Sequence, residues 1–301
     1  MTMLLRENPK TVIGIRCHVI SDVERNFYNA IKEMVSGDIE VFFVKDCCNN
    51  TAGDFYDQSF VEMSQSVSLI EDLYFPENVG WLCGDYFYFA LMNSVDADFY
   101  WLVEPDVKFS DGASDFFLKF QDDSSDFLSI RFGRKDKNWY WFEFVSDYFD
   151  EVYGCSFPVT RMSKKAVEYV LEQRRRFTCL KKSNEISRFP NDESLVSTSI
   201  KNAGYKCRDV TSIYLADYSG FSTMIPRLAE TLNASGAAIW HPVLNWSEFK
   251  KKFPVRLTAA LRNNKGDEFL SKSLNGLDSI KVSEVILSSI DVFESFSRAK
   301  E

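Results

Sequence analysis

The chain has 301 residues, 45% hydrophobic and 26% charged, which is enough to bury a sizeable core in one large domain or two small ones. Its formal net charge of −9 argues against a broad nucleic-acid-binding surface, which would need clustered lysine and arginine. Seven scattered cysteines without C-x-x-C spacing, and only two histidines, argue against a structural zinc site and fit reduced thiols in a cytosol.

The first elements alternate between strand and helix. A β-branched run over 11–20 predicts a buried strand, residues 23–35 have helical apolar spacing, and 39–46 predicts a second strand that ends in Asp46. Strand, helix and strand at this spacing form a βαβ unit, which implies a parallel sheet. A polar, turn-rich stretch over 47–60 follows.

The later segments continue the α/β pattern. We expect strands over 96–107, 126–133 and 206–211, with the aromatic block 138–145 as a further candidate strand, and helices over 85–95, 162–177 and 191–205. An amphipathic helical region begins at about residue 267. The prediction is therefore an α/β fold, a mixed but mainly parallel sheet flanked by helices, over 1–265, with a helical C-terminal extension over 266–301.

Two carboxylates end the apolar strand "FYWLV", in the sequence Glu104-Pro105-Asp106. Ligands of an open parallel sheet bind beyond the carboxyl ends of its strands, and Arg16 and Asp46 end two other predicted strands. Paired carboxylates there suit a hard divalent ion such as Mg²⁺ or Mn²⁺. The alternative is a strand terminated by Pro105 and followed by two solvated acids.

Three other features carry a functional and a plain interpretation. Gly84-Asp85 either offers free backbone N–H groups to an anionic ligand or simply starts a helix. Asp192 and Glu193 at a predicted helix start are either a general base or a capping sequence, in which Asn191 or Asp192 is the cap. His241, in "IWHPV", is either a ligand for Mn²⁺ or an ordinary polar residue.

The N-terminal βαβ unit and the segment 78–107 resemble the GT-A class of nucleotide-sugar glycosyltransferases, in which a helix precedes a hydrophobic strand ending in a D-x-D motif. Glu104-Pro105-Asp106 would be that motif, with glutamate in place of the first aspartate. Asp106 matches the main metal ligand of the family, and His241 resembles its late metal-binding histidine. The resemblance covers roughly residues 10–245, with a nucleotide-sugar half over 10–110 and an acceptor half over 111–265.

The resemblance implies a metal-dependent glycosyltransferase, expected to be inverting, in which Asp106 and His241 bind Mn²⁺ or Mg²⁺ and Glu104 assists. The residues expected to contact the donor are Arg16, Asp46, Gly84, Asp85 and Glu104. Asp192 is the first candidate for the base and Glu193 the second.

The expected donor is a UDP-linked hexose, for example galactose. The expected acceptor is a glycan or lipid-linked glycan of bacterial polysaccharide biosynthesis. No secretory signal or membrane-length apolar run is present, so we expect a cytoplasmic protein. The basic segment 248–266 is either a solvated face or a peripheral contact with an anionic membrane. Residues 139–141 are either a sugar-stacking platform or part of the core.

Two rival functions remain at this point. A nucleotidyltransferase of related fold shares the sheet and the metal logic, but the sequence "IGIRCHVISD" lacks the glycine-rich loop that such an enzyme needs for its triphosphate. A non-catalytic carbohydrate-binding protein with a decayed site is the other rival.

Overall fold

The computed structural model describes residues 9–35, 37, 39–46, 59–68, 70 and 72–298, so most of the polar stretch over 47–60 lies outside the described residues. The chain divides into two compact units. Unit 1 consists of Met1–Pro105 and Asp115–Tyr214, and unit 2 consists of Asp106–Ser114 and Leu215–Glu301. The sequence places a boundary at residue 265, whereas here the segment 215–265 belongs with the C-terminal helices.

Unit 1 is built on a seven-stranded sheet in the order β3-β2-β1-β4-β7-β6-β8. Its strands are β1 (Thr11–Cys17), β2 (Glu40–Lys45), β3 (Phe60–Glu62), β4 (Phe99–Val103), β6 (Phe127–Arg134), β7 (Tyr153–Ser163) and β8 (Cys207–Asp209). Among the strands that the structure describes in this sheet, β7 alone runs antiparallel to its neighbours. This mixed, mainly parallel sheet confirms the predicted fold class.

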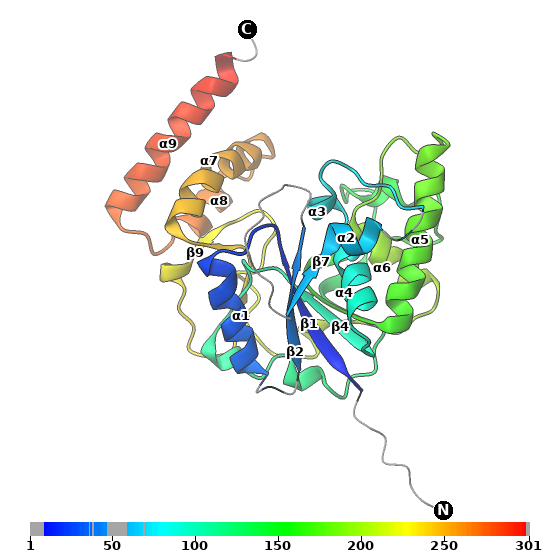
Figure 1. Ribbon diagram of the computed structural model, residues 1–301. Coiled ribbons are helices and arrows are strands. Elements are labelled where there is room, and N and C mark those ends of the chain that lie inside the picture. Colours follow the sequence, from blue (N-terminus) through cyan, green and yellow to red (C-terminus); the bar gives the residue numbers. More distant parts are fainter. Residues whose placement is uncertain are drawn as a thin grey trace, which may run out of the picture. The chain divides into compact units, whose positions relative to one another are not determined.

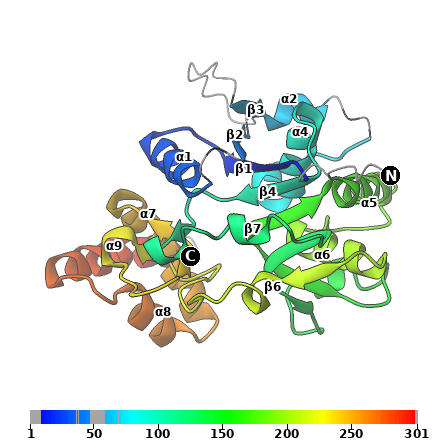
Figure 2. The ribbon, with the colours of Figure 1, turned by 90° about the horizontal axis from the view of Figure 1, so that it is seen from below.

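Helices cover both faces of this sheet. They are α1 (Asp22–Met34), α2 (Met63–Ser68), α3 (Val79–Leu82), α4 (Asp85–Ser94), α5 (Lys164–Lys182) and α6 (Asp192–Asn202). Figures 1 and 2 show α1 on one side of the strands and α4, α5 and α6 on the other. On the α1 side the ring of Tyr28 stacks on Phe43 of β2 at 4.7 Å.

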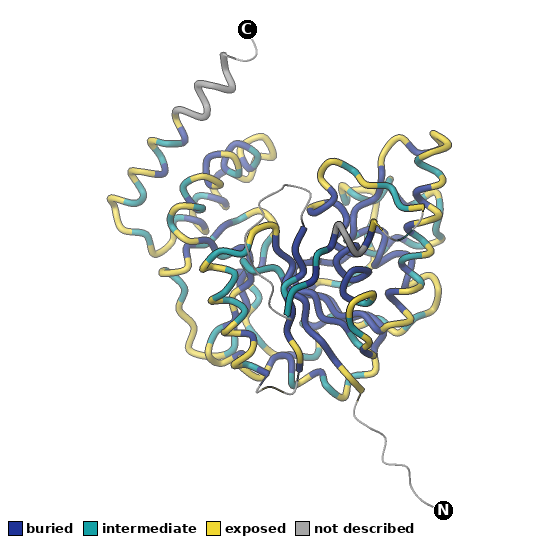
Figure 3. Tube along the Cα trace, in the orientation of Figure 1, coloured by how far each residue is buried: buried dark blue, intermediate teal, exposed yellow. Residues whose placement is uncertain are grey.

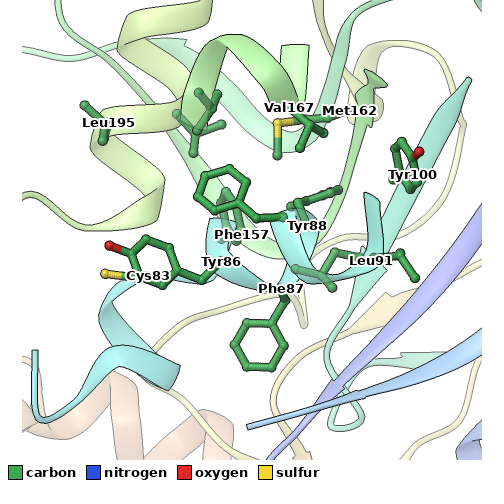
Figure 4. Close-up of a cluster of buried hydrophobic side chains, with 14 of the residues drawn as sticks. Cys83, Tyr86, Phe87, Tyr88, Leu91, Tyr100, Phe157, Met162, Val167 and Leu195 are labelled. Atoms are coloured by element: carbon green, nitrogen blue, oxygen red, sulfur yellow. The ribbon is translucent and has the colours of Figure 1, made fainter. Parts of the chain in front are cut away.

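The central strands β1 and β4 are buried on both faces, as parallel strands between helices must be (Figure 3). Figure 4 shows α4 in a large hydrophobic core, where its side chains meet those of β4, β7, α5 and α6. Gly14 of β1 lets α4 approach, because a Cβ there would lie 3.0 Å from Leu91. On the opposite face, Trp101 packs against Phe116, Phe117 and Phe120.

Unit 2 has its own core. Its strands are β5 (Lys108–Phe109), β9 (Arg227–Leu228), β10 (Ile239–Trp240) and β11 (Val243–Leu244), and its helices are α7 (Trp246–Arg262), α8 (Gly266–Ser273) and α9 (Ser279–Arg298). Phe249, Phe253 and Leu257 of α7 pack with Phe269 of α8 and Val285 of α9. Within the part of the chain that the structure describes, no helix has both the length and the apolar character needed to span a bilayer.

Three segments differ from the sequence-based expectation. The aromatic block 138–145 forms turns and the 3-10 helix Phe142–Phe144, not a strand. The sequence interpretation missed β7, whose Pro158 lies where its register with β6 is irregular. It also did not predict that most of the basic segment 248–266 is helical, as part of α7.

Candidate functional site

The first part of the site lies at the carboxyl ends of β1 and β4 in unit 1. Arg16 of β1 donates from Nη1 to Glu104 Oε1 at 2.9 Å, and the same atom lies 3.5 Å from Asp192 Oδ2. Its Nη2 donates to the carbonyl of Gly80. The guanidinium is buried and lies 5.1 Å from the centre of the Phe87 ring. The buried Arg16 guanidinium therefore interacts with the carboxylates of Glu104 and Asp192, which come from distant parts of the chain.

The start of α6 presents the two candidate acids. Asn191 is the N-cap, because its side-chain oxygen accepts from the Ser194 amide at 3.0 Å. Asp192 is not the cap: its Oδ2 accepts from the Gly84 amide at 2.8 Å, and its Oδ1 accepts from the Glu193 amide at 2.8 Å. The cap therefore leaves the Asp192 carboxylate to face Arg16 and Gly84.

Both acids have raised pKa values. Burial raises the pKa of Asp192 to about 7, although the charge of Arg16 opposes the shift. Burial, followed by the charge of Asp192, raises the pKa of Glu193 to about 8. Two carboxyl groups that titrate near neutral pH are suited to exchanging protons with a substrate hydroxyl.

Two glycines make room for these carboxylates. A Cβ on Gly84 would overlap Asp192 Oδ2 and lie 2.5 Å from Arg16 Nη1. A Cβ on Gly80 would overlap Asp46 Oδ2 and lie 2.6 Å from His18 Cε1. Asp46 is buried at the end of β2, and its Oδ2 lies 3.3 Å from Nδ1 of the exposed His18. The segment around α3 can thus lie directly against the carboxylates.

A buried ion pair lies beside the start of α6 and binds the residue that precedes its cap. Arg174 donates to both oxygens of Asp85, at 2.5 and 2.7 Å, and both side chains have no exposed surface. The same guanidinium donates to the carbonyl of Pro190, at 2.6 Å. Asp85, expected from the sequence to contact a donor, therefore joins α4 to α5, while Arg174 also binds Pro190, the residue that precedes the Asn191 cap.

The second part of the site lies in unit 2. Asp106 Oδ1 is 3.3 Å from His241 Nε2. His241 Nδ1 is 2.8 Å from the carbonyl oxygen of Ser222, which can only accept, so Nδ1 carries a hydrogen. In the neutral ring Nε2 then carries the lone pair and faces the carboxylate, which is the tautomer that binds metals through Nε2.

Strand pairing brings these two residues together. β5 and β10 are antiparallel, with Trp240 opposite Lys108. Beyond that pair, the Val243 amide donates to the carbonyl of Asp106 at 2.7 Å. A segment that follows the apolar strand β4 is thus joined to one that comes more than 130 residues later in the chain.

The surroundings of Asp106 are positive. Burial alone would raise the pKa of its carboxyl group, but protonated His241, through its charge and its hydrogen bond, and the charges of Lys252 and Arg256 outweigh burial and lower it. Lys252 and Arg256 lie one turn apart on α7.

Glu104 is tied to this pair by the chain. Only Pro105 separates it from Asp106, and one intervening residue spans at most about 7 Å between Cα atoms. Glu104, Asp106 and His241 offer a set of ligand atoms that could hold a metal ion. Two carboxylates and an imidazole suit Mn²⁺, and the carboxylates suit Mg²⁺.

The sequence-predicted residues fall into three groups. The first, in unit 1, contains Arg16, Gly84, Glu104, Asp192 and Glu193, with Asp85 paired to Arg174 behind it; the second, in unit 2, contains Asp106 and His241; and Asp46 lies with His18 and Gly80. Arg174 was not predicted from the sequence, although its place in the helical pattern indicated a buried charged residue. Val167, Val170 and Phe177 form a buried helical stripe, in which Arg174 occupies an apolar position.

Comparison with known proteins identifies no family. No protein-family model and no curated protein matches the chain. Among solved structures, one described as the crystal structure of a glycosyltransferase involved in the glycosylation of the major capsid of PBCV-1 is 9% identical, with a TM-score of 0.32. The match covers 67% of this chain and 82% of that one. The fold class of this chain therefore rests on its own strand order.

Proposed function

We propose that the protein is a metal-dependent glycosyltransferase that moves a sugar from a nucleotide-diphosphate donor to a glycan hydroxyl. The observation that carries the proposal is the Asp106–His241 pair, in which Ser222 sets the tautomer of His241 and Pro105 alone separates Asp106 from Glu104. The resemblance of this order, a D-x-D-like motif followed by a late histidine, to GT-A enzymes supports the sugar-nucleotide assignment.

Asp106 and His241 would bind Mn²⁺ or Mg²⁺ directly, with Glu104 assisting from the end of β4. A bound divalent ion would neutralise the diphosphate and stabilise its departure. Lys252 and Arg256, which act on Asp106 from α7, would add positive charge for the same phosphates.

Glu193 is the better base of the two acids, and Asp192 its positioning partner. The oxygens of Asp192 accept from the Gly84 and Glu193 amides, and its side chain is almost fully buried. Glu193 is the more exposed, and an acceptor hydroxyl must be able to reach the base. In an inverting reaction Glu193 would take the hydroxyl proton while the acceptor oxygen bonds to the anomeric carbon. The bond from that carbon to the diphosphate would break, and the nucleoside diphosphate would leave.

Donor hydrolysis tests the proposal. The purified protein with Mn²⁺ should release UDP from at least one UDP-sugar in a panel that also includes GDP-, dTDP- and CMP-sugars. Asp106→Ala should lower the rate at least a hundredfold, because removing the carboxylate weakens the metal site. Asp111→Ala is the matched control, since it removes an exposed acid from the same segment and should leave the rate unchanged.

The rivals predict other outcomes. A nucleotidyltransferase would release pyrophosphate from a nucleoside triphosphate and a sugar 1-phosphate. A carbohydrate-binding protein with a decayed site would neither turn over a donor nor bind UDP more tightly with Mn²⁺ in calorimetry. The absence of both hydrolysis and metal-dependent nucleotide binding would overturn the enzyme assignment.

A further inference from the structure

An aromatic cluster lies on the surface of unit 1. Trp81 of α3 and Tyr140 are 62% and 70% exposed. The Trp81 ring lies 5.9 Å from Trp141, and Tyr140 meets Trp141 edge-on at 4.7 Å. Phe144 closes the group, 5.0 Å from Trp141. Aromatic side chains that are exposed to water in such a close group indicate a binding surface more often than part of a hydrophobic core.

The cluster is continuous with the candidate acids through the backbone of α3. Arg16 Nη2 donates to the carbonyl of Gly80 and lies 3.4 Å from that of Trp81, while its Nη1 pairs with Glu104. The cluster therefore begins at Trp81, whose carbonyl oxygen lies beside the Arg16 guanidinium that also contacts Glu104 and Asp192.

The position of Tyr140 and Trp141 favours the acceptor over the nucleotide base. Trp141 belongs to the connection between β6 and β7, on the side of β4 away from β2. Asp46, the candidate contact for the nucleoside, ends β2 on the other side of β1. Tyr140 and Trp141 thus belong to the half of the sheet that does not carry Asp46, whereas Trp81 directly follows Gly80, which lies against Asp46.

The loop that carries Tyr140 and Trp141 is acidic and favours a neutral polyol over an anionic lipid, with one neighbouring cation in Arg188, whose guanidinium lies 5.4 Å from the centre of the Phe144 ring. The segment 136–151 carries five carboxylates and one lysine, a net charge of −4. Glu143 and Asp147 are both exposed there. Carboxylates accept hydrogen bonds from sugar hydroxyls and repel phospholipid head groups. The apolar C–H face of a pyranose ring suits the negative face of an indole or phenol.

We propose that Trp81, Tyr140 and Trp141 form a platform on which a pyranose unit of the acceptor glycan stacks. The identification of the bound saccharide as the acceptor rests on the proposed glycosyltransferase function, whereas saccharide binding itself does not depend on that function. Stacking would hold the glycan while Glu193 takes the proton from its hydroxyl.

Indole N–H resonances test the platform in the full-length protein. The probes are tetrasaccharides of β-linked glucose, β-linked N-acetylglucosamine, α-linked mannose and β-linked galactose. At least one series should shift the signals of Trp81 and Trp141, assigned with Trp81→Phe and Trp141→Phe. Trp81→Ala and Tyr140→Ala should each weaken the affinity tenfold or more. Leu215→Ala is the matched control, since it removes an 89% exposed apolar side chain elsewhere and should leave the affinity unchanged.

Donor hydrolysis, run on the same samples, separates the two proposals. Saccharide binding with neither donor hydrolysis nor metal-dependent nucleotide binding would overturn the enzyme assignment and leave the platform standing. Hydrolysis with no saccharide-induced shift of Trp81 or Trp141 would overturn the platform. A shift caused by phosphatidylglycerol vesicles and by no saccharide would overturn it in favour of a membrane contact.

Discussion

Asp192 and Glu193 share one helix start but differ in what surrounds them, and this difference sets the expected pH dependence. If Glu193 is the base, turnover requires its ionised form, whose pKa is about 8. We expect kcat to rise about tenfold per pH unit below that pKa and to level above it. Glu193→Gln should remove the rise and lower kcat at least a thousandfold. An unchanged profile in Glu193→Gln would exclude this residue as the base.

The pKa of Asp192 also predicts a stability trend. Its folded value of about 7 exceeds the unfolded value of 3.8, so between these pH values the folded state binds more protons. The free energy of unfolding should therefore fall as pH rises from about 4 to 7, by on the order of 1 to 3 kcal/mol from this residue. Asp192→Asn should remove that part of the decline in urea unfolding at several pH values. A slope equal to that of the wild type would contradict the raised pKa.

Gly84 makes a residue-scale prediction about space. Gly84→Ala would place a methyl group against Asp192 Oδ2 and Arg16 Nη1, so one of them must move. We expect a loss of about 1 to 3 kcal/mol in unfolding free energy and a lower kcat. Gly133→Ala is the matched control, because its Cβ would have no atom within 4 Å. Equal effects of the two substitutions would show that the contacts of Gly84 do not matter.

At the scale of elements, the Arg174–Asp85 pair fixes where α6 begins. Arg174→Met should destabilise the protein by about 3 to 5 kcal/mol, since it leaves the Asp85 carboxylate buried without its cation. Arg175→Met changes the exposed neighbour and should cost less than about 0.5 kcal/mol. Adding Asp85→Asn to Arg174→Met should restore part of the loss in denaturant unfolding. No restoration would mean that packing, and not charge, dominates at this position.

Periodicity predicted the elements that follow simple patterns and missed those that break them. β1 and β2 are short runs rich in β-branched or aromatic residues, and α4 begins where Gly84 indicated. β7 contains Pro158, which reads as a strand breaker until the irregular pairing with β6 accommodates it. The candidate ligands were chosen by residue type and order, but the Arg16–Glu104 bond joins residues 88 apart, which no local pattern encodes.

At the scale of the whole molecule, α8 and α9 belong to the core that supports the Asp106–His241 pair. A chain ending at residue 265 would uncover Phe249, Phe253 and Leu257 of α7, which pack against Phe269 and Val285. We expect this truncation to abolish Mn²⁺ binding and to aggregate, as followed by calorimetry and light scattering. A soluble truncated protein with unchanged Mn²⁺ affinity would support the sequence-based boundary at 265.

The antiparallel strand β7 has a consequence for synthesis of the chain. β4 pairs with β1 on one edge and with β7 on the other, and β7 follows it by about 50 residues. At about 5 to 20 residues per second, a ribosome needs several seconds to make that interval. During this time the edge of "FYWLV" offers unpaired amides and carbonyls to any neighbouring nascent chain. The most vulnerable state of this protein is therefore a half-made sheet, and chaperone depletion during translation should affect its yield more than heating the finished fold.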